Sequence, residues 1–118
     1  MELRVLSDDG DVVRLQLVGH NVQSESPPSL EALDKLLGSE GYAQRVMLSL
    51  AETRFIDSSG LSWLVVCHKR FCQGGGKLVV HSLSPALMEL LKMMRLDKAL
   101  FVAEDESAAL ELARKESP

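Results

Sequence analysis

The residues with the clearest chemical potential are three consecutive polar side chains, Asp57, Ser58 and Ser59, followed by Gly60. They precede a segment whose apolar residues recur with a helical period. A carboxylate or hydroxyl in this place accepts hydrogen bonds from the first amides of a helix, so the simplest interpretation is an N-cap. A serine there is also exposed, and the amides and dipole of a helix N-terminus favour an added anion such as phosphate. The junction at residues 55–60 is therefore the first candidate site.

Serine catalysis is the alternative chemistry for this junction. Ser58 would need a nearby base, for which His68 and His81 are available. The Gly-x-Ser-x-Gly motif of a nucleophile elbow is missing, because Ile56 and Gly60 stand at the two glycine positions. We therefore expect no catalytic residues and no enzyme activity.

A glycine run, Gly74–Gly76, precedes Lys77 and invites comparison with a phosphate-binding P-loop. That motif needs a glycine five residues before the Gly-Lys pair and Ser or Thr after it. Phe71 and Leu78 occupy those places, and the run leads into a strand rather than a helix. The run is expected to end a helix, and no nucleotide or other cofactor is predicted.

Metal binding has little support in the sequence. His20, His68 and His81 lie far apart in the sequence, and they form no i,i+4 pair or cysteine–histidine spacing typical of metal ligands. His68 lies on a helical apolar stripe, where a hydrogen-bonded core or edge histidine is expected. Cys67 and Cys72 are separated by about 140° around a helix, so both are expected to be packing thiols of a reducing compartment.

Composition narrows the class of protein. The chain has 118 residues, of which 46% are hydrophobic, which suits a single domain over residues 1–118. Acidic residues outnumber basic ones by 17 to 13, and the basic residues are scattered along the sequence, so nucleic acid is not an expected ligand. No signal peptide and no apolar run of about 18 residues occurs. We expect a cytoplasmic protein without membrane insertion.

The elements that must position the junction follow from periodicity and turn residues. A hairpin is predicted from residues 3–6 and 12–18, a helix after Ser29 that ends at Gly38, and a buried strand over residues 46–50.

The second half of the chain alternates helix and strand. The stripe after Gly60 predicts a helix as far as the glycine run. A strand at 77–81, a helix capped by Ser84, a short strand at 100–102 and a helix at about 105–115, capped by Asp105 or Ser107, complete the order. This pattern predicts an α/β fold with a small mixed sheet of four to five strands, the later ones parallel, with helices packed against it. Such sheets place ligand and partner sites where strands lead into helix N-termini.

A family resemblance rests on the order of these motifs. Apolar residues 46–51 followed by Phe-Ile-Asp-Ser-Ser-Gly-Leu at 55–61 resemble the signature of STAS domains, the family of bacterial anti-sigma factor antagonists. The likeness continues through Lys69-Arg70-Phe71, Leu83-Ser84-Pro85 and Arg95-Leu96-Asp97-Lys98, and covers roughly residues 44–113.

The resemblance implies a function as a switch. Antagonists of this type bind an anti-sigma factor that is also a serine kinase, which then phosphorylates the serine after the Asp, here Ser58. A serine phosphatase would reset the switch. Asp57, Ser58, Ser59 and Gly60 are the implied partner contacts, and the protein is expected to be a monomer or weak dimer.

One loop departs from the family pattern. Where many members have Gly-Glu-Leu-Asp, this chain has Gly19, His20, Asn21 and Val22, and His20 and Asn21 take the place of the residues that contact the partner. Two other functions stay open. One is a constitutive STAS adaptor, such as a subunit of a lipid-transporting ABC system or a signalling scaffold, and the other is a small-molecule-binding or hydrolytic domain.

Overall fold

A five-stranded sheet forms the centre of the computed structural model, which describes residues 1–19, 27–54 and 56–115. Its strands lie in chain order: β1 Glu2–Asp8, β2 Val13–Val18, β3 Arg45–Ser49, β4 Lys77–His81 and β5 Phe101–Ala103. β1 is antiparallel to β2, and each later neighbour is parallel. The predicted α/β fold with a mixed sheet is confirmed.

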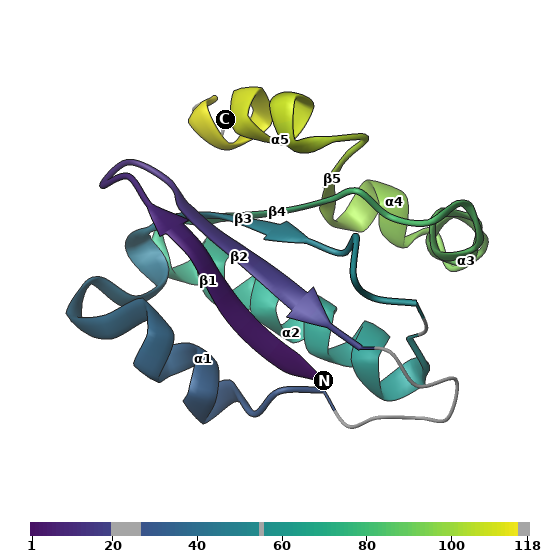
Figure 1. The fold of residues 1–118 in the computed structure, drawn as a ribbon, viewed down its shortest axis with the longest axis horizontal. Coiled ribbons are helices and arrows are strands. Elements are labelled where there is room, and N and C mark those ends of the chain that lie inside the picture. Colours follow the sequence, from purple (N-terminus) through teal and green to yellow (C-terminus); the bar gives the residue numbers. More distant parts are fainter. Residues whose placement is uncertain (20–26, 55, 116–118) are drawn as a thin grey trace.

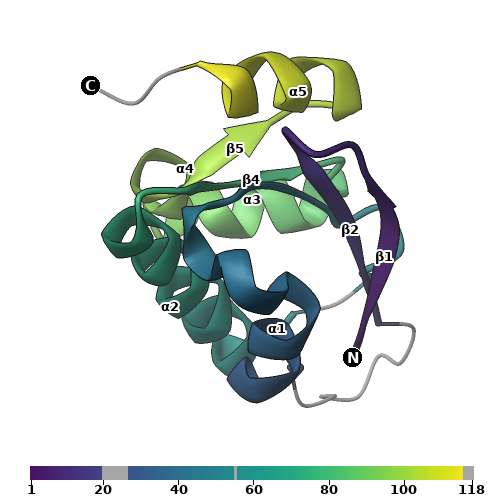
Figure 2. The ribbon, with the colours of Figure 1, turned by 90° about the vertical axis from the view of Figure 1, so that its left-hand side faces the viewer.

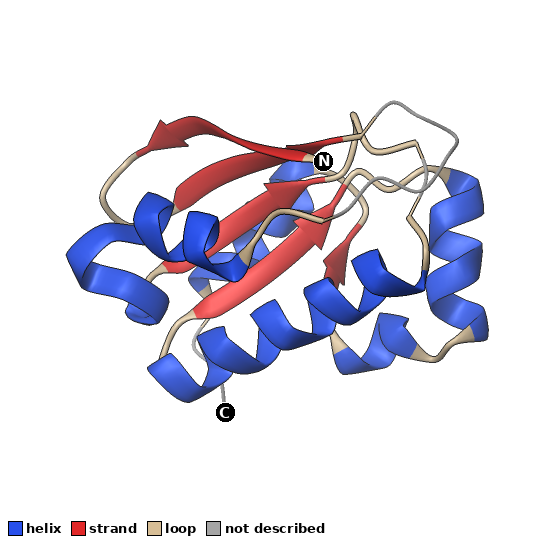
Figure 3. Ribbon diagram, turned by 90° about the horizontal axis from the view of Figure 1, so that it is seen from below, coloured by secondary structure: helices blue, strands red, loops and turns tan. Residues whose placement is uncertain are grey.

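Helices cover both faces of this sheet (Figures 1 and 2). They are α1 Leu30–Leu37, the 3-10 helix η1 Gly38–Ala43, α2 Ser58–Gly74, α3 Pro85–Met93, α4 Leu96–Ala99 and α5 Glu106–Arg114. α1 and α2 lie on one side of the sheet and α5 on the other (Figure 1). Figure 3 shows the molecule from the side of α1 and α2, with helices lying across the strands.

Strand periodicity divides the core between the two faces. Successive residues of β3 and β4 point to opposite sides of the sheet. Val46, Leu48 and Val80 join a large cluster with the apolar sides of α1, α2 and α3. Met47 and Val79 join a smaller cluster with α5, whose buried residues are alanines that allow the helix to lie close to the sheet. Both faces of these two strands are therefore buried, as their continuous apolar sequence predicts.

Side-chain caps begin the main helices where the sequence places them. Ser29 accepts a hydrogen bond from the Ala32 amide, and Ser84 accepts one from Leu87. Of the two caps offered for the last helix, Asp105 is the one formed. Gly75 ends α2 in the left-handed region with φ 85°, so the glycine run ends a helix as predicted.

Two short helices and one cysteine differ from expectation. η1 and α4 are too short to show a periodic pattern, and the sequence did not predict them. Arg95, with φ 58°, joins α3 to α4. Cys67 is buried as expected, whereas the prediction for Cys72 is wrong, because Cys72 is exposed on the outer side of α2.

Candidate functional site

The candidate site lies where the chain passes from β3 into α2, at the carboxyl edge of the parallel strands. Asp57 precedes the helix in an extended conformation, with φ −92° and ψ −173°. Its Oδ1 accepts hydrogen bonds from the amides of Ser59, at 3.0 Å, and Gly60, at 3.1 Å. The carboxylate therefore satisfies two of the amides that a helix N-terminus leaves unpaired.

The two serines beside this cap differ in their bonding. Ser59 donates its hydroxyl to the same Oδ1 of Asp57, at 2.6 Å. Ser58, the first residue of α2, is exposed, and its hydroxyl makes no hydrogen bond to any part of the chain that the structure describes. The capping role belongs to Asp57, and the hydroxyl of Ser58 is left accessible.

Packing within the chain explains the residues that follow. Gly60 is buried, and a Cβ atom built there would lie 2.6 Å from Cγ2 of Ile56. Glycine at this position therefore lets Ile56 pack under the first turn of α2. Leu61 is buried in the core, as predicted. These contacts hold the turn rigidly behind the exposed hydroxyl.

The histidines do not join Ser58. Nδ1 of His81 lies 2.8 Å from Oγ of Ser82, and the ring of His68 lies 5.5 Å from that of Phe101. Burial lowers the pKa of both histidines, and for His81 the nearby carboxylates of Asp105 and Glu106 raise it in part. Neither histidine hydrogen-bonds to Ser58 within the described residues, so the serine–base pair of a hydrolase is not formed there.

One contact on α2 corrects the expectation that no histidine is paired with a cysteine. Nε2 of His68 lies 3.6 Å from Sγ of Cys72, one helical turn away. This pair was not predicted from the sequence. Two ligands do not make a metal site, and within residues 1–19, 27–54 and 56–115 no group of three His, Cys, Asp or Glu side chains is close enough to hold a metal ion.

A shallow apolar groove beside Ser58 was not predicted. It has a volume of about 410 Å³ and lies between the outer side of α2 and the corner that joins α3 to α4. Its lining consists of Ser58, Leu61, Ser62, Val65, Val66, Met94 and Leu96. Because Ser58 is part of this lining, a charge added at its hydroxyl would change the electrostatic potential in the groove.

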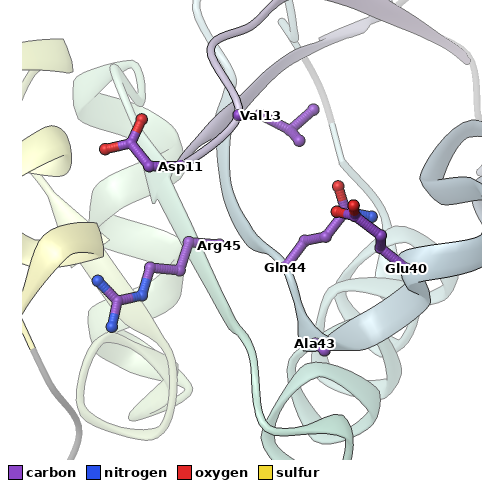
Figure 4. A pocket seen from close by; sticks show the side chains of 7 residues that line it. Asp11, Val13, Glu40, Ala43, Gln44 and Arg45 are labelled. Carbon is purple, nitrogen blue, oxygen red and sulfur yellow. The ribbon is translucent and has the colours of Figure 1, made fainter.

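A second hollow lies at the opposite, amino edge of the sheet (Figure 4). Arg45 and Asp11 lie on one side of it and Glu40 and Gln44 on the other (Figure 4). Arg45 donates to the Arg114 carbonyl, and Gln44 donates to two carbonyls of the preceding helical segment. Since these groups are engaged within the chain, this hollow is a weaker candidate than the junction.

Two predicted contacts lie outside the described residues, namely His20 and Asn21. Among the helices that the structure describes, none is long and apolar enough to cross a bilayer.

Comparison with known proteins gives a consistent set of relatives. Residues 5–104 match the family model described as "Mlab, STAS domain". An anti-sigma F factor antagonist from Paenibacillus polymyxa is 34% identical over 67 residues, which are 57% of this chain and 57% of that protein. The match thus spans little more than half the length of this curated relative.

Solved structures share the fold. An anti-sigma-factor antagonist (STAS) domain protein from Planctomyces limnophilus aligns with a TM-score of 0.71 at 20% identity, over 96% of this chain and 98% of that chain. A variant of RsbS from Moorella thermoacetica aligns with a TM-score of 0.68 at 16% identity, over 97% and 96% of the two chains. The chain is similar to anti-sigma factor antagonists, and it belongs to the STAS domain family.

Proposed function

We propose that this STAS domain binds an anti-sigma factor that is also a serine kinase, and that phosphorylation of Ser58 releases it. One observation supports this above the others. Both adjacent serines are exposed, but the hydroxyl of Ser59 is bonded to Asp57, whereas that of Ser58, the first residue of α2, makes no hydrogen bond to a described residue. A kinase can reach such a hydroxyl without disturbing the cap.

The fold tolerates the modification while the interface does not. The γ-phosphoryl group of ATP passes to Oγ of Ser58, the hydroxyl proton is lost and ADP leaves. The product carries about −1.5 to −2 charge, which the amides and dipole at the start of α2 favour. In a closed interface the same charge must be desolvated, and the neighbouring Asp57 carboxylate repels it. Partner binding is therefore lost while the domain stays folded.

The remaining parts of the proposal follow the family. Asp57 and Ser59, together with His20 and Asn21, supply further contacts to the partner, whereas Gly60 is buried and acts through its packing against Ile56. A serine phosphatase restores the free hydroxyl. The domain acts in the cytoplasm as a monomer or weak dimer, has no catalytic role and needs no cofactor.

Matched serine variants test the switch. The purified full chain is incubated with ATP and the anti-sigma factor kinase of its own organism, and phosphate is located by mass spectrometry. We expect phosphate on the wild type and on Ser59→Ala, and none on Ser58→Ala. Ser58→Asp should weaken binding to the kinase by at least about tenfold, which corresponds to 1.4 kcal/mol. Equal phosphorylation of Ser58→Ala would contradict the proposal.

A constitutive adaptor is the second candidate. The observation that favours it is that Asp57 and Ser59 complete the cap by themselves, so the bare hydroxyl of Ser58 can serve as a plain polar contact. An adaptor of an ABC system would bind an ATPase and show no phosphate turnover. Copurification with an ATPase from the same gene neighbourhood, with Ser58 unmodified, would favour this function.

A further inference from the structure

The groove beside Ser58 is lined mainly by apolar side chains, with Ser58 and Ser62 as its polar members. On α2, Ser58, Ser62 and Val65 recur at helical spacing and form one stripe along the outer side of the helix. Met94 and Leu96 line the groove from the opposite wall. The lining residues Val66 and Met94 are 38% and 58% exposed, and Met93, beside the groove, is 76% exposed. Clustered exposure of this kind marks an interaction surface more often than chance.

What we call the rim of the groove consists of basic residues that lie within about one helical turn of a lining residue along the chain, namely Lys69, Lys92, Arg95 and Lys98. Lys69 is exposed one helical turn beyond Val65 on the same side of α2, and Arg95 is exposed between the lining residues Met94 and Leu96. Lys92 and Lys98 are exposed on the same corner, where the one carboxylate between them is Asp97. These cations form no ion pair with any residue in the described part of the chain.

Most other cations are engaged within the molecule. Those that contact a carboxylate or a backbone carbonyl are Arg4, Arg14, Lys35, Arg45, Arg70, Lys77 and Arg114. Among the described residues, Arg54 and Lys115 are the cations away from the corner that lack such a contact. The protein has a net charge of −4, so four cations at the rim that form no ion pair with a described residue are a local exception.

We propose that this groove binds an acidic amphipathic helix of the partner protein, an inference that rests on the proposed function. The apolar side of such a helix fills the space between α2 and Met94, as in other helix-in-groove complexes. Its carboxylates pair with Lys69 and Arg95 at the rim. A concave apolar floor receives a convex helix better than a flat bilayer, and phosphates of a nucleic acid would leave that floor unfilled.

The position of Ser58 in the lining explains how one phosphate can control this surface. The added charge repels the carboxylates of the helix that lie closest to Ser58 and adds a desolvation cost at that end of the groove. A switch at one end of the groove thus opposes binding along it, with no change in the fold.

Designed peptides test the chemistry of the occupant. Three probes are titrated into the ¹⁵N-labelled full chain: a helical peptide of about 15 residues with leucines on one side and glutamates beside them, the same peptide with lysines for glutamates, and vesicles of phosphatidylglycerol. We expect the acidic peptide alone to shift the amide signals of residues 58–69 and 92–98. Equal or stronger binding of the basic peptide or of the vesicles would overturn the proposal.

Charge reversal locates the contact. Lys69→Glu and Arg95→Glu should each lower the affinity for the acidic peptide by about tenfold. Lys115→Glu should leave this affinity unchanged, because Lys115 lies away from the groove, although its ammonium group also forms no ion pair with a described residue. Ser58→Asp should also lower the affinity of the chain for the acidic peptide. Unchanged affinity in both rim variants would overturn the proposal.

A cross-linker tests the natural partner. A photoreactive phenylalanine at Val66 is expected to capture an acidic, amphipathic peptide of the kinase that modifies Ser58, identified by mass spectrometry. A captured segment that is neutral or basic contradicts the groove proposal even if Ser58 is phosphorylated. Binding of the acidic peptide to a chain that no kinase modifies would instead contradict the switch alone, so the two failures can be told apart.

Discussion

The α5 side of the molecule and the corner beside Ser58 use the same kinds of residue in opposite ways. On the α5 side, Lys77 is buried and donates to the carbonyls of Leu112 and Lys115, at 2.8 and 3.1 Å. Arg114 of α5 pairs with Asp11, at 3.0 Å. At the corner, the cations form no ion pair with any described residue, and methionines are exposed. One region uses its charges to hold a helix in place, whereas the other leaves them available to a second molecule.

The largest expected difference in the free energy of unfolding is between substitutions of Leu91 within α3 and of Met94 at its C-terminal cap. Leu91 is 0% exposed, so Leu91→Ala should lower the free energy of unfolding by about 2–5 kcal/mol, because it removes core contacts and leaves a cavity. Met94→Ala should change it by less than about 0.5 kcal/mol. Urea denaturation of both variants measures this, and a large cost for Met94→Ala would mean that the groove is part of the core.

Two lysines provide the next comparison. Lys77→Met should cost about 1.5–3 kcal/mol, because two carbonyls at the end of α5 lose a charged donor. Lys69→Met removes an unpaired cation and should leave the stability within about 0.5 kcal/mol of the wild type. Thermal and chemical denaturation check both values. Equal effects of the two substitutions would remove the distinction between the regions.

The junction itself offers a smaller effect. Asp57→Ala should cost about 0.5–2 kcal/mol, because the amides of Ser59 and Gly60 lose their acceptor. Ser58→Ala should be neutral in stability, although it abolishes phosphorylation. If Ser58→Ala were the more destabilising of the two, the hydroxyl would have a structural role.

The smallest effect is a dependence on pH. Burial lowers the pKa of His81 below the 6.5 of an unperturbed histidine, so the unfolded chain takes up protons first as the pH falls. The free energy of unfolding should therefore decrease below about pH 6.5, by about 1.4 kcal/mol for each unit by which the pKa is lowered.

Denaturation curves at pH 7 and pH 5 measure this change. The carboxylates of Asp105 and Glu106 raise the pKa of His81 in part and limit the loss of stability. His68 has a lowered pKa as well, so His81→Asn and His68→Asn are compared. The decrease at pH 5 should be smaller in His81→Asn than in the wild type, and an undiminished decrease would contradict the assignment to His81.

Much of the fold could be predicted from local signals. Ser29, Ser84 and Asp105 cap helices at the predicted places, since a cap depends on residues within one turn of it. The order of strands and helices followed from periods of two and of about 3.6. α4 was missed because four residues cannot show a period.

The helix caps and the family motif around Ser58 could be predicted because each depends on residues that are close in the chain, and the mixed sheet could be predicted from the order of strands and helices. The hydrogen bond of Ser59 to Asp57, the exposed hydroxyl of Ser58 and the groove that Met94 and Leu96 form with α2 became evident only in the folded chain. Residues of α2 and of the α3–α4 corner, which are about 30 positions apart in the sequence, line this groove together. Local spacing cannot encode such a grouping, because it arises from contacts between segments far apart in the chain.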